Sequence, residues 1–263
     1  MSTSSPARRT FALIAGFLLL CGSARAVRAD EIRVMTSGAF TAAYLELIPA
    51  FERATNDTIV TSYGGSMGNA PDSIPSRLQR GEPVDVVIMA ASALDDLIKQ
   101  GKVVAGSRVD LVRSSIGMAV RAGAPKPDIS TVEALTRTLL EAASIAYSSS
   151  ASGVYLSTEF FPRLGITDRI AAKSRRIESD PVGAVVARGG AEIGFQQISE
   201  LRPVAGIDIV GPLPPGAQRV TVFAAGIASG ARRPDAAKAL IAFLASPASA
   251  PAIRKSGLEP VTP

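Results

Sequence analysis

The strongest constraint on the fold is a regular alternation of short apolar segments with longer amphipathic ones. The segment PVDVVIMA, residues 83–90, is apolar enough to be buried on both faces, as the strands of parallel sheets are. The next segment, SALDDLIKQG, has apolar residues at helical spacing and predicts a helix with a cap at Ser92 and a stop at Gly101. Strands that alternate with helices in this way indicate an α/β fold.

The same alternation covers most of the chain. Strands are expected at 31–37, 57–63, 114–123, 144–148, 191–197 and 220–228, and helices at 40–51, 130–142, 152–165, 179–190, 234–244 and 247–256. Of the 263 residues, 47% are hydrophobic and 19% charged, which is ordinary for a folded protein of one large domain or two medium ones.

Residues 1–29 predict a cleaved signal peptide rather than part of the fold. Two arginines precede an apolar run, residues 11–20, and the sequence VRA indicates cleavage after Ala29. The ten-residue run is too short to span a bilayer. We therefore expect export to a bacterial periplasm.

Removal of this segment changes the charge of the chain. Residues 1–29 hold four of the 28 basic residues and none of the 23 acidic ones, so 24 basic residues remain and the net charge is +1. Nucleic-acid binding is not expected, because no basic excess is left to neutralise phosphates. The single cysteine, Cys21, leaves with the signal peptide, which excludes a disulfide in the mature chain.

The chain contains no histidine, which excludes several kinds of catalytic site. Histidine-dependent triads, H-E-x-x-H zinc sites and imidazole bases are all impossible. The segment GGSMG, residues 64–68, matches the G-x-S-x-G nucleophile motif, but Ser66 has no histidine partner. We expect neither a metal nor a cofactor, and any catalytic base must be a carboxylate, lysine, tyrosine or activated hydroxyl.

Three loops of small residues each follow a predicted strand. They contain TSGA at 36–39, GGSMG at 64–68 and SSSASG at 148–153. Ligands of α/β proteins bind at the carboxyl ends of strands, and the free N–H groups of a helix start attract anions. Each loop alone is better explained as a turn and helix cap, because Ser and Gly are the usual capping residues. Three such loops together favour a shared anion pocket.

Several segments in order resemble a known family. They are VMTSGAFTAAY, RGEPVDVVIMA, SASGVY, DPVGAVVARGGAEIGF and ALIAFLASPASAPAIRKSGLEP. They resemble the molybdate-binding (type II) branch of the periplasmic solute-binding proteins of ABC transporters, over nearly all of the mature chain. The resemblance implies two α/β lobes with the ligand in the interlobe cleft. It places one lobe at 30–112 plus 219–263 and the other at 113–218.

The expected pocket departs from the molybdate pattern. A serine of the family falls on Ala39 and a tyrosine on Gln197, and the loop after residue 63 is longer than usual. Ser66 and Ser152 still match the family's ligand contacts. These changes favour a larger ligand with more than one polar end. From the loops and the resemblance together, the expected ligand-binding residues are Ser37, Gly38, Ser66, Met67, Gly68, Ser150, Ser152, Gly153, Gln196 and Gln197.

A nearer resemblance narrows the expected function. The pattern SMG…P…IP.RL.RGE, together with GFQQISEL, resembles the aconitate isomerase branch of this fold. It implies a tricarboxylate ligand and an allylic proton shift between cis- and trans-aconitate. Residues in or beside the loops that are candidates for the base are Asp72, Tyr63, Tyr147, Tyr155 and Asp180, each of which is also explained as a cap or wall residue. The alternative is a monomeric binding protein that delivers molybdate, or another small oxyanion or carboxylate, to an ABC transporter permease.

Overall fold

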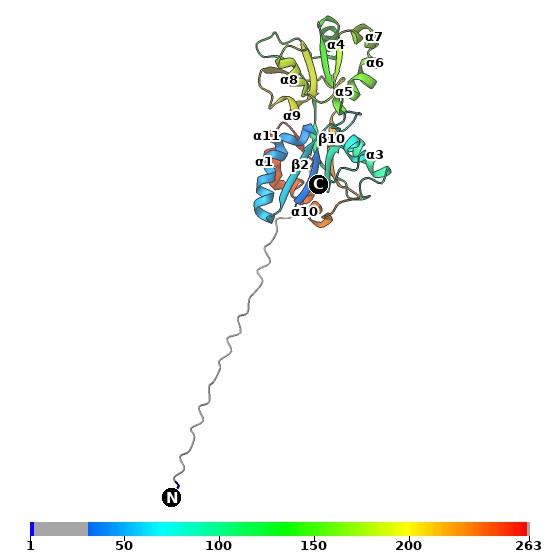
Figure 1. The fold of residues 1–263 in the computed structure, drawn as a ribbon. Helices are drawn as coiled ribbons and strands as arrows, with labels where there is room; N and C mark the ends of the chain where they lie inside the picture. The colour runs from blue at the N-terminus through cyan, green and yellow to red at the C-terminus, as the bar shows by residue number, and fades with distance from the viewer. Residues whose placement is uncertain (3–30, 262–263) are drawn as a thin grey trace.

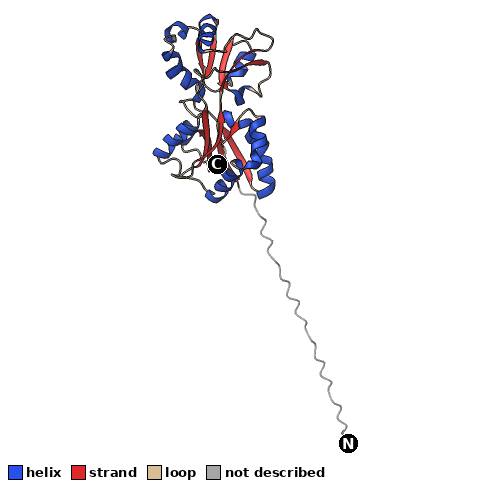
Figure 2. Ribbon diagram, turned by 180° about the vertical axis from the view of Figure 1, so that it is seen from behind, coloured by secondary structure: helices blue, strands red, loops and turns tan. Residues whose placement is uncertain are grey.

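The structure is a computed structural model that describes residues 1–2 and 31–261. The predicted signal peptide therefore lies almost wholly outside the described residues. Two groups of helices and strands stand one above the other and meet at a narrow waist (Figure 1). Seen from behind, each group has a central sheet with helices on its flanks (Figure 2). This is an α/β architecture, as the sequence predicts.

The first sheet has six strands, ordered β11-β4-β10-β3-β1-β2. Their bounds are β1 (Glu31–Thr36), β2 (Thr58–Tyr63), β3 (Val86–Ala90), β4 (Val109–Ser114), β10 (Thr221–Ile227) and β11 (Glu259–Pro260). β1 pairs in parallel with β2 and β3, and β10 runs antiparallel to β3 and β4.

Helices cover both faces of this sheet. On one face lie α1 (Gly38–Thr55), α10 (Pro234–Leu244) and α11 (Ala250–Lys255), and on the other lie α2 (Ile74–Gln79) and α3 (Ala91–Lys99). β3 is buried along its whole length: Ile88 packs in the first of these cores, and its neighbours Val87 and Met89 pack in the second. The prediction that this strand is buried on both faces is confirmed.

Among the described residues no single helix is long and apolar enough to cross a membrane. Only α10 together with residues 247–255 reaches that length, as a pair bent by 57°. Four apolar residues of α10, namely Ala237, Leu240, Ile241 and Leu244, are buried in the core that also contains residues of α1.

The second sheet has five strands, ordered β7-β6-β8-β5-β9. Their bounds are β5 (Ile116–Arg121), β6 (Ile145–Ser148), β7 (Ser174–Ile177), β8 (Ile193–Gln197) and β9 (Ile207–Pro212). The helices of this half are α4 (Val132–Glu141), α5 (Ala151–Tyr155), α6 (Phe161–Arg163), α7 (Thr167–Ala171), α8 (Val182–Ala187) and α9 (Ile198–Leu201). Residues of α4 to α7 pack in one core and residues of α8 in another.

The chain passes between the sheets twice, in short segments. Ser115 alone separates β4 from β5, and residues 213–220 join β9 to β10. Gln218 ties these two passages together: its Oε1 accepts the Ile116 N–H at 2.8 Å, and its Nε2 donates to the Ile116 carbonyl at 2.9 Å. The lobe limits taken from the family resemblance remain a prediction.

The structure differs from the sequence-based expectation in several places. The helix expected at 152–165 is α5, a π-helical turn at Leu156–Phe160 and α6 in succession. The strands β4, β7, β9 and β11 and the short helices α2, α7 and α9 were not expected. β7 and β9 were missed because neither has a buried apolar run. Both lie at the edges of the second sheet, where side chains stay largely accessible.

A glycine sets how closely α5 follows β6. A Cβ atom added at Gly153 would overlap the carbonyl oxygen of Ser148. We expect Gly153→Ala to lower the free energy of unfolding by about 1–3 kcal/mol, as overpacking of a closed site does. Gly230→Ala is the matched control, since a Cβ there meets nothing within 4 Å. Urea unfolding of both variants tests this, and equal stability of the two would contradict it.

Candidate functional site

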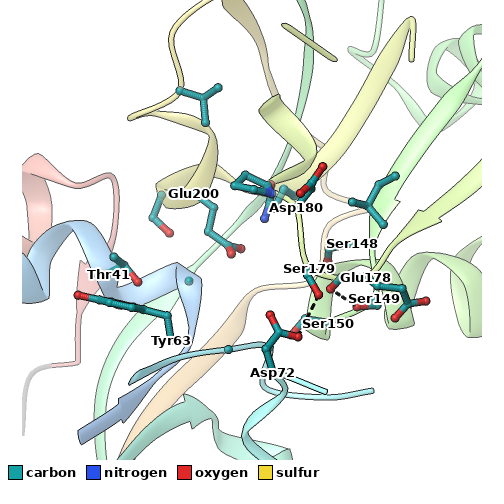
Figure 3. A pocket seen from close by; sticks show the side chains of 18 of the residues that line it. Thr41, Tyr63, Asp72, Ser148, Ser149, Ser150, Glu178, Ser179, Asp180 and Glu200 are labelled. Atoms are coloured by element: carbon teal, nitrogen blue, oxygen red, sulfur yellow. Dashed lines mark hydrogen bonds between the residues drawn. The ribbon is translucent and has the colours of Figure 1, made fainter. Parts of the chain in front are cut away.

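A cleft of about 400 Å³ lies between the two sheets, within the size range of small-molecule sites (Figure 3). From the first sheet's side it is lined by the start of α1 and by the loop between β2 and α2. From the second sheet's side it is lined by the loops after β6 and β7 and by α9. The lining residues include Gly38, Thr41, Tyr63, Gly64, Gly65, Asp72, Ser148, Ser149, Ser150, Glu178, Ser179, Asp180, Gln196, Ser199 and Glu200.

A second, much smaller cavity of about 10 Å³ lies beside the cleft. Its lining residues are Ser37, Gly38, Ala39, Ser66, Ser150, Ala151, Ser152, Gln197, Glu200 and Phe223. All three small-residue loops contribute to it. Gly38, Ser150 and Glu200 line both spaces, so they mark the place where the two meet. The inner cavity has room for about one water molecule.

Hydrogen bonds between the loops hold this arrangement. The Ser66 N–H donates to Ser150 Oγ at 3.0 Å and so joins a loop of the first sheet to a loop of the second. Ser66 Oγ in turn accepts the Ala90 N–H at 2.9 Å, at the end of β3. The position of each loop therefore depends on the others.

Three buried polar atoms at the site have no partner. They are Ser37 Oγ, Gln197 Oε1 and Ser199 Oγ, on residues that are only 2%, 1% and 1% exposed. Ser37 and Gln197 line the inner cavity, and Ser199 lines the cleft. An unsatisfied buried polar group costs about 1–3 kcal/mol, so these three atoms are candidate contacts for a bound ligand.

Seven of the ten expected ligand-binding residues line one or both spaces. These are Ser37, Gly38, Ser66, Ser150, Ser152, Gln196 and Gln197. The other three, Met67, Gly68 and Gly153, are not among the lining residues. Met67 packs against the apolar cores of the first sheet, and Gly68 adopts φ +86°, a conformation that favours glycine. Contact of any of the ten with a ligand stays a prediction.

The expected bases divide into two groups. Tyr63, Asp72 and Asp180 line the cleft. Tyr155 is 5% exposed and donates its hydroxyl to the Ala217 carbonyl at 3.0 Å. Tyr147 packs edge-on against a phenylalanine in the second sheet's core, so these two tyrosines have structural positions.

The charged residues that line the cleft are all acidic. No lysine or arginine is among the described lining residues. Asp180 is paired with Arg188 at 2.5 Å, and Glu178 with Arg176 at 2.8 Å. Asp72 accepts a hydrogen bond of 3.0 Å from Ser179 Oγ, which spans the cleft.

The fourth carboxylate, Glu200, makes no ion pair within the described part of the chain, and in this it resembles Asp72 and differs from Glu178 and Asp180. It lies on α9, which packs against α1, and a methyl group on Gly38 would overlap its carboxylate. Burial raises the pKa of Glu200 to about 7, although the Gln196 amide and the Gln197 N–H oppose the shift.

Sequence reasoning missed Glu200. It belongs to the segment GFQQISEL, which was used only as a family marker. One signal in the sequence could have identified it. Glu200 is an acidic residue in the first helical turn after the end of a buried strand, β8.

Two curated proteins are similar to this chain over most of its length. Aconitate isomerase of a Pseudomonas species is 51% identical over 230 residues, which are 88% of both chains. The molybdate-binding protein ModA of Azotobacter vinelandii is 30% identical over 202 residues, which are 75% of this chain and 74% of that one.

Solved structures of type II binding proteins share the fold. The periplasmic molybdate-binding protein of Azotobacter vinelandii superposes with a TM-score of 0.68 at 22% identity, over 88% of this chain and 99% of that one. The sulfate-binding protein SubI of Mycobacterium tuberculosis does so with a TM-score of 0.70 at 18% identity, over 89% and 88%. The predicted fold class is thus confirmed.

The match to a family covers nearly all of the described fold. Residues 32–259 match the description "Bacterial extracellular solute-binding protein". This chain is a homologue of aconitate isomerase and belongs to the family of bacterial extracellular solute-binding proteins.

Proposed function

We propose that this protein is a periplasmic enzyme that interconverts cis- and trans-aconitate in the cleft between its two sheets. The observation that carries the proposal is the 51% identity to aconitate isomerase over 88% of both chains. The size of the cleft supports it, because about 400 Å³ accommodates a six-carbon tricarboxylate better than a compact oxyanion.

The reaction is an allylic proton shift. A base removes a proton from the methylene carbon, and the electron pair of that C–H bond spreads over the three-carbon allyl unit and its carboxylates. The proton then adds to the former vinyl carbon, so the double bond moves and the molecule neither gains nor loses an atom. The protein must supply a base and donors that stabilise the growing negative charge.

The donors in this cleft are neutral. The start of α1 presents free backbone N–H groups beside Gly38, and the hydroxyls of Ser37, Ser150 and Ser199 lie around the same space. The unpartnered atoms of Ser37 and Ser199 are available to a bound carboxylate. A polyanion is therefore held by hydrogen bonds and the α1 dipole rather than by ion pairs.

A second function is favoured by one observation, the 30% identity to a molybdate-binding protein. In that case the protein is a monomer that delivers an anion to a transporter permease. The inner cavity of about 10 Å³ is too small for a compact oxyanion unless the loops move. A rise in melting temperature with molybdate, without one for any tricarboxylate, would favour this function over the first.

The direct test of the proposed activity is a proton NMR time course of cis-aconitate with the purified mature protein. We expect the signals of trans-aconitate to appear and the two isomers to reach a constant ratio from either starting side. An unchanged spectrum at high protein concentration would refute the isomerase proposal.

Ser199 provides a test of ligand contact. We expect Ser199→Ala to weaken binding of the unreactive analogue tricarballylate (propane-1,2,3-tricarboxylate) by about 10- to 100-fold, because a hydrogen bond to a charged group contributes about 1.5–3 kcal/mol. Ser246→Ala is the matched control, since Ser246 Oγ is also buried without a partner but lies outside the cleft. Calorimetry on both variants measures these affinities. Equal affinities of the two variants would show that Ser199 does not contact the ligand.

The all-acidic lining predicts an unusual response to salt. We expect the affinity for tricarballylate to stay constant or to rise between about 50 mM and about 200 mM salt, because ions screen the repulsion from the four carboxylates. A steep loss of affinity with salt would contradict recognition by neutral donors.

A further inference from the structure

We infer that Glu200 is the catalytic residue that carries the proton, taking it from the methylene carbon of the substrate and returning it to the former vinyl carbon. This inference rests on the proposed isomerase function and adds to it the identity of the acid–base group.

The position of Glu200 is the first argument. It is the only one of the four cleft carboxylates that lines both the cleft and the inner cavity, among the described lining residues. Its carboxylate points from α9 into the space between Thr41 and Tyr63 on one side and the loop 148–150 on the other (Figure 3). A substrate bound where the two spaces meet would lie beside this group.

The neighbourhood of Glu200 is the second argument. Its carboxylate lies against Gly38 at the start of α1, and the unpartnered hydroxyl of Ser199 belongs to the preceding residue. The start of α1 and Ser199 therefore bring donors suited to a substrate carboxylate to the same cleft as the group that would remove the neighbouring proton. An allylic proton shift needs this adjacency, because the negative charge develops next to the carbon that loses the proton.

The other acidic groups of the cleft are engaged elsewhere. Glu178 and Asp180 are paired with arginines, and Asp72 accepts a hydrogen bond from Ser179. Tyr63 is 43% exposed at the mouth of the cleft. Asp72 and Glu200 are thus the two cleft carboxylates without an ion pair in the described chain, and of these two Glu200 alone also lines the inner cavity.

One carboxylate suffices for the whole reaction. Ionised Glu200 accepts the methylene proton as the C–H bond breaks, and the neutral acid then protonates the former vinyl carbon, which restores the carboxylate. Its pKa of about 7 supports this role, because such a group is a stronger base than an ordinary carboxylate and is still ionised near neutral pH.

The charged and titratable groups around Glu200 determine how the rate depends on pH. Tyr63 and Asp72 face it from the first sheet's side of the cleft, and Glu178 and Asp180 line the cleft on its own side. Beyond the cleft, Glu46 on α1, which is paired with Lys255, and Arg202 at the end of α9 line a neighbouring pocket. A bound trianion adds negative charge and raises the pKa of Glu200 further. The base must be ionised, so kcat/KM falls as pH drops below about 7, and the inflection in kcat lies at higher pH.

The test compares Glu200→Gln with Glu31→Gln, which changes an exposed, ion-paired glutamate outside the cleft. We expect Glu200→Gln to lower kcat by about 10²- to 10⁴-fold, the usual contribution of a general acid–base group. Tricarballylate binding should be unchanged or tighter in that variant, because a repulsive charge is removed. Glu31→Gln should keep kcat within about threefold, as surface substitutions away from the site do.

Each outcome supports or overturns the assignment. Wild-type protein that does not convert cis-aconitate refutes the proposed function and this role with it. Turnover by Glu200→Gln within about tenfold of wild type refutes the role of Glu200 alone. If that variant fails to fold or to bind tricarballylate, the wild-type pH profile decides. An inflection of kcat/KM near pH 7 supports Glu200, and a flat profile from about pH 6 to about pH 8 overturns it.

Discussion

The arrangement of the whole molecule depends on the hydrogen bonds that Gln218 makes to the backbone of Ile116. At this point the two passages between the sheets lie side by side, and one of them is a single residue long. So short a connection holds the sheets close together. The loops at their strand ends therefore face each other, and the bond from the Ser66 N–H to Ser150 Oγ becomes possible. The loops touch at this hydrogen bond, and the space that remains between them elsewhere is the cleft.

The chemistry of the cleft follows from its unusual charge. A site for a polyanion that is lined by four carboxylates works only if most of that negative charge is offset. Arg176 and Arg188 offset two of the carboxylates from outside the cleft, and a hydroxyl binds a third. The fourth, Glu200, is left with a raised pKa. The proton transfer proposed for this cleft would therefore take place on a fold that molybdate- and sulfate-binding proteins share, since function depends on the site rather than on the fold.

Much of the fold could be predicted from the sequence because its strongest signals are local. The buried strand β3 and helices such as α3, α4 and α10 lie where their apolar periodicity indicates. The edge strands β7 and β9 were missed because an edge strand needs no apolar run. The π-helical turn after α5 was missed because its register depends on packing around Phe160 and Phe161.

For the site, the sequence by itself determined which kinds of side chain are available for chemistry. It excluded histidine chemistry, located three loops of small residues, and named seven of the residues that line the two spaces. It did not single out Glu200, and it placed Tyr147 and Tyr155 among the possible bases. Only the tertiary structure decided these points, because the pKa and accessibility of a side chain depend on residues far away in sequence. Burial raises the pKa of Glu200, and the carboxylate lies against Gly38, which is more than 150 residues earlier in the chain.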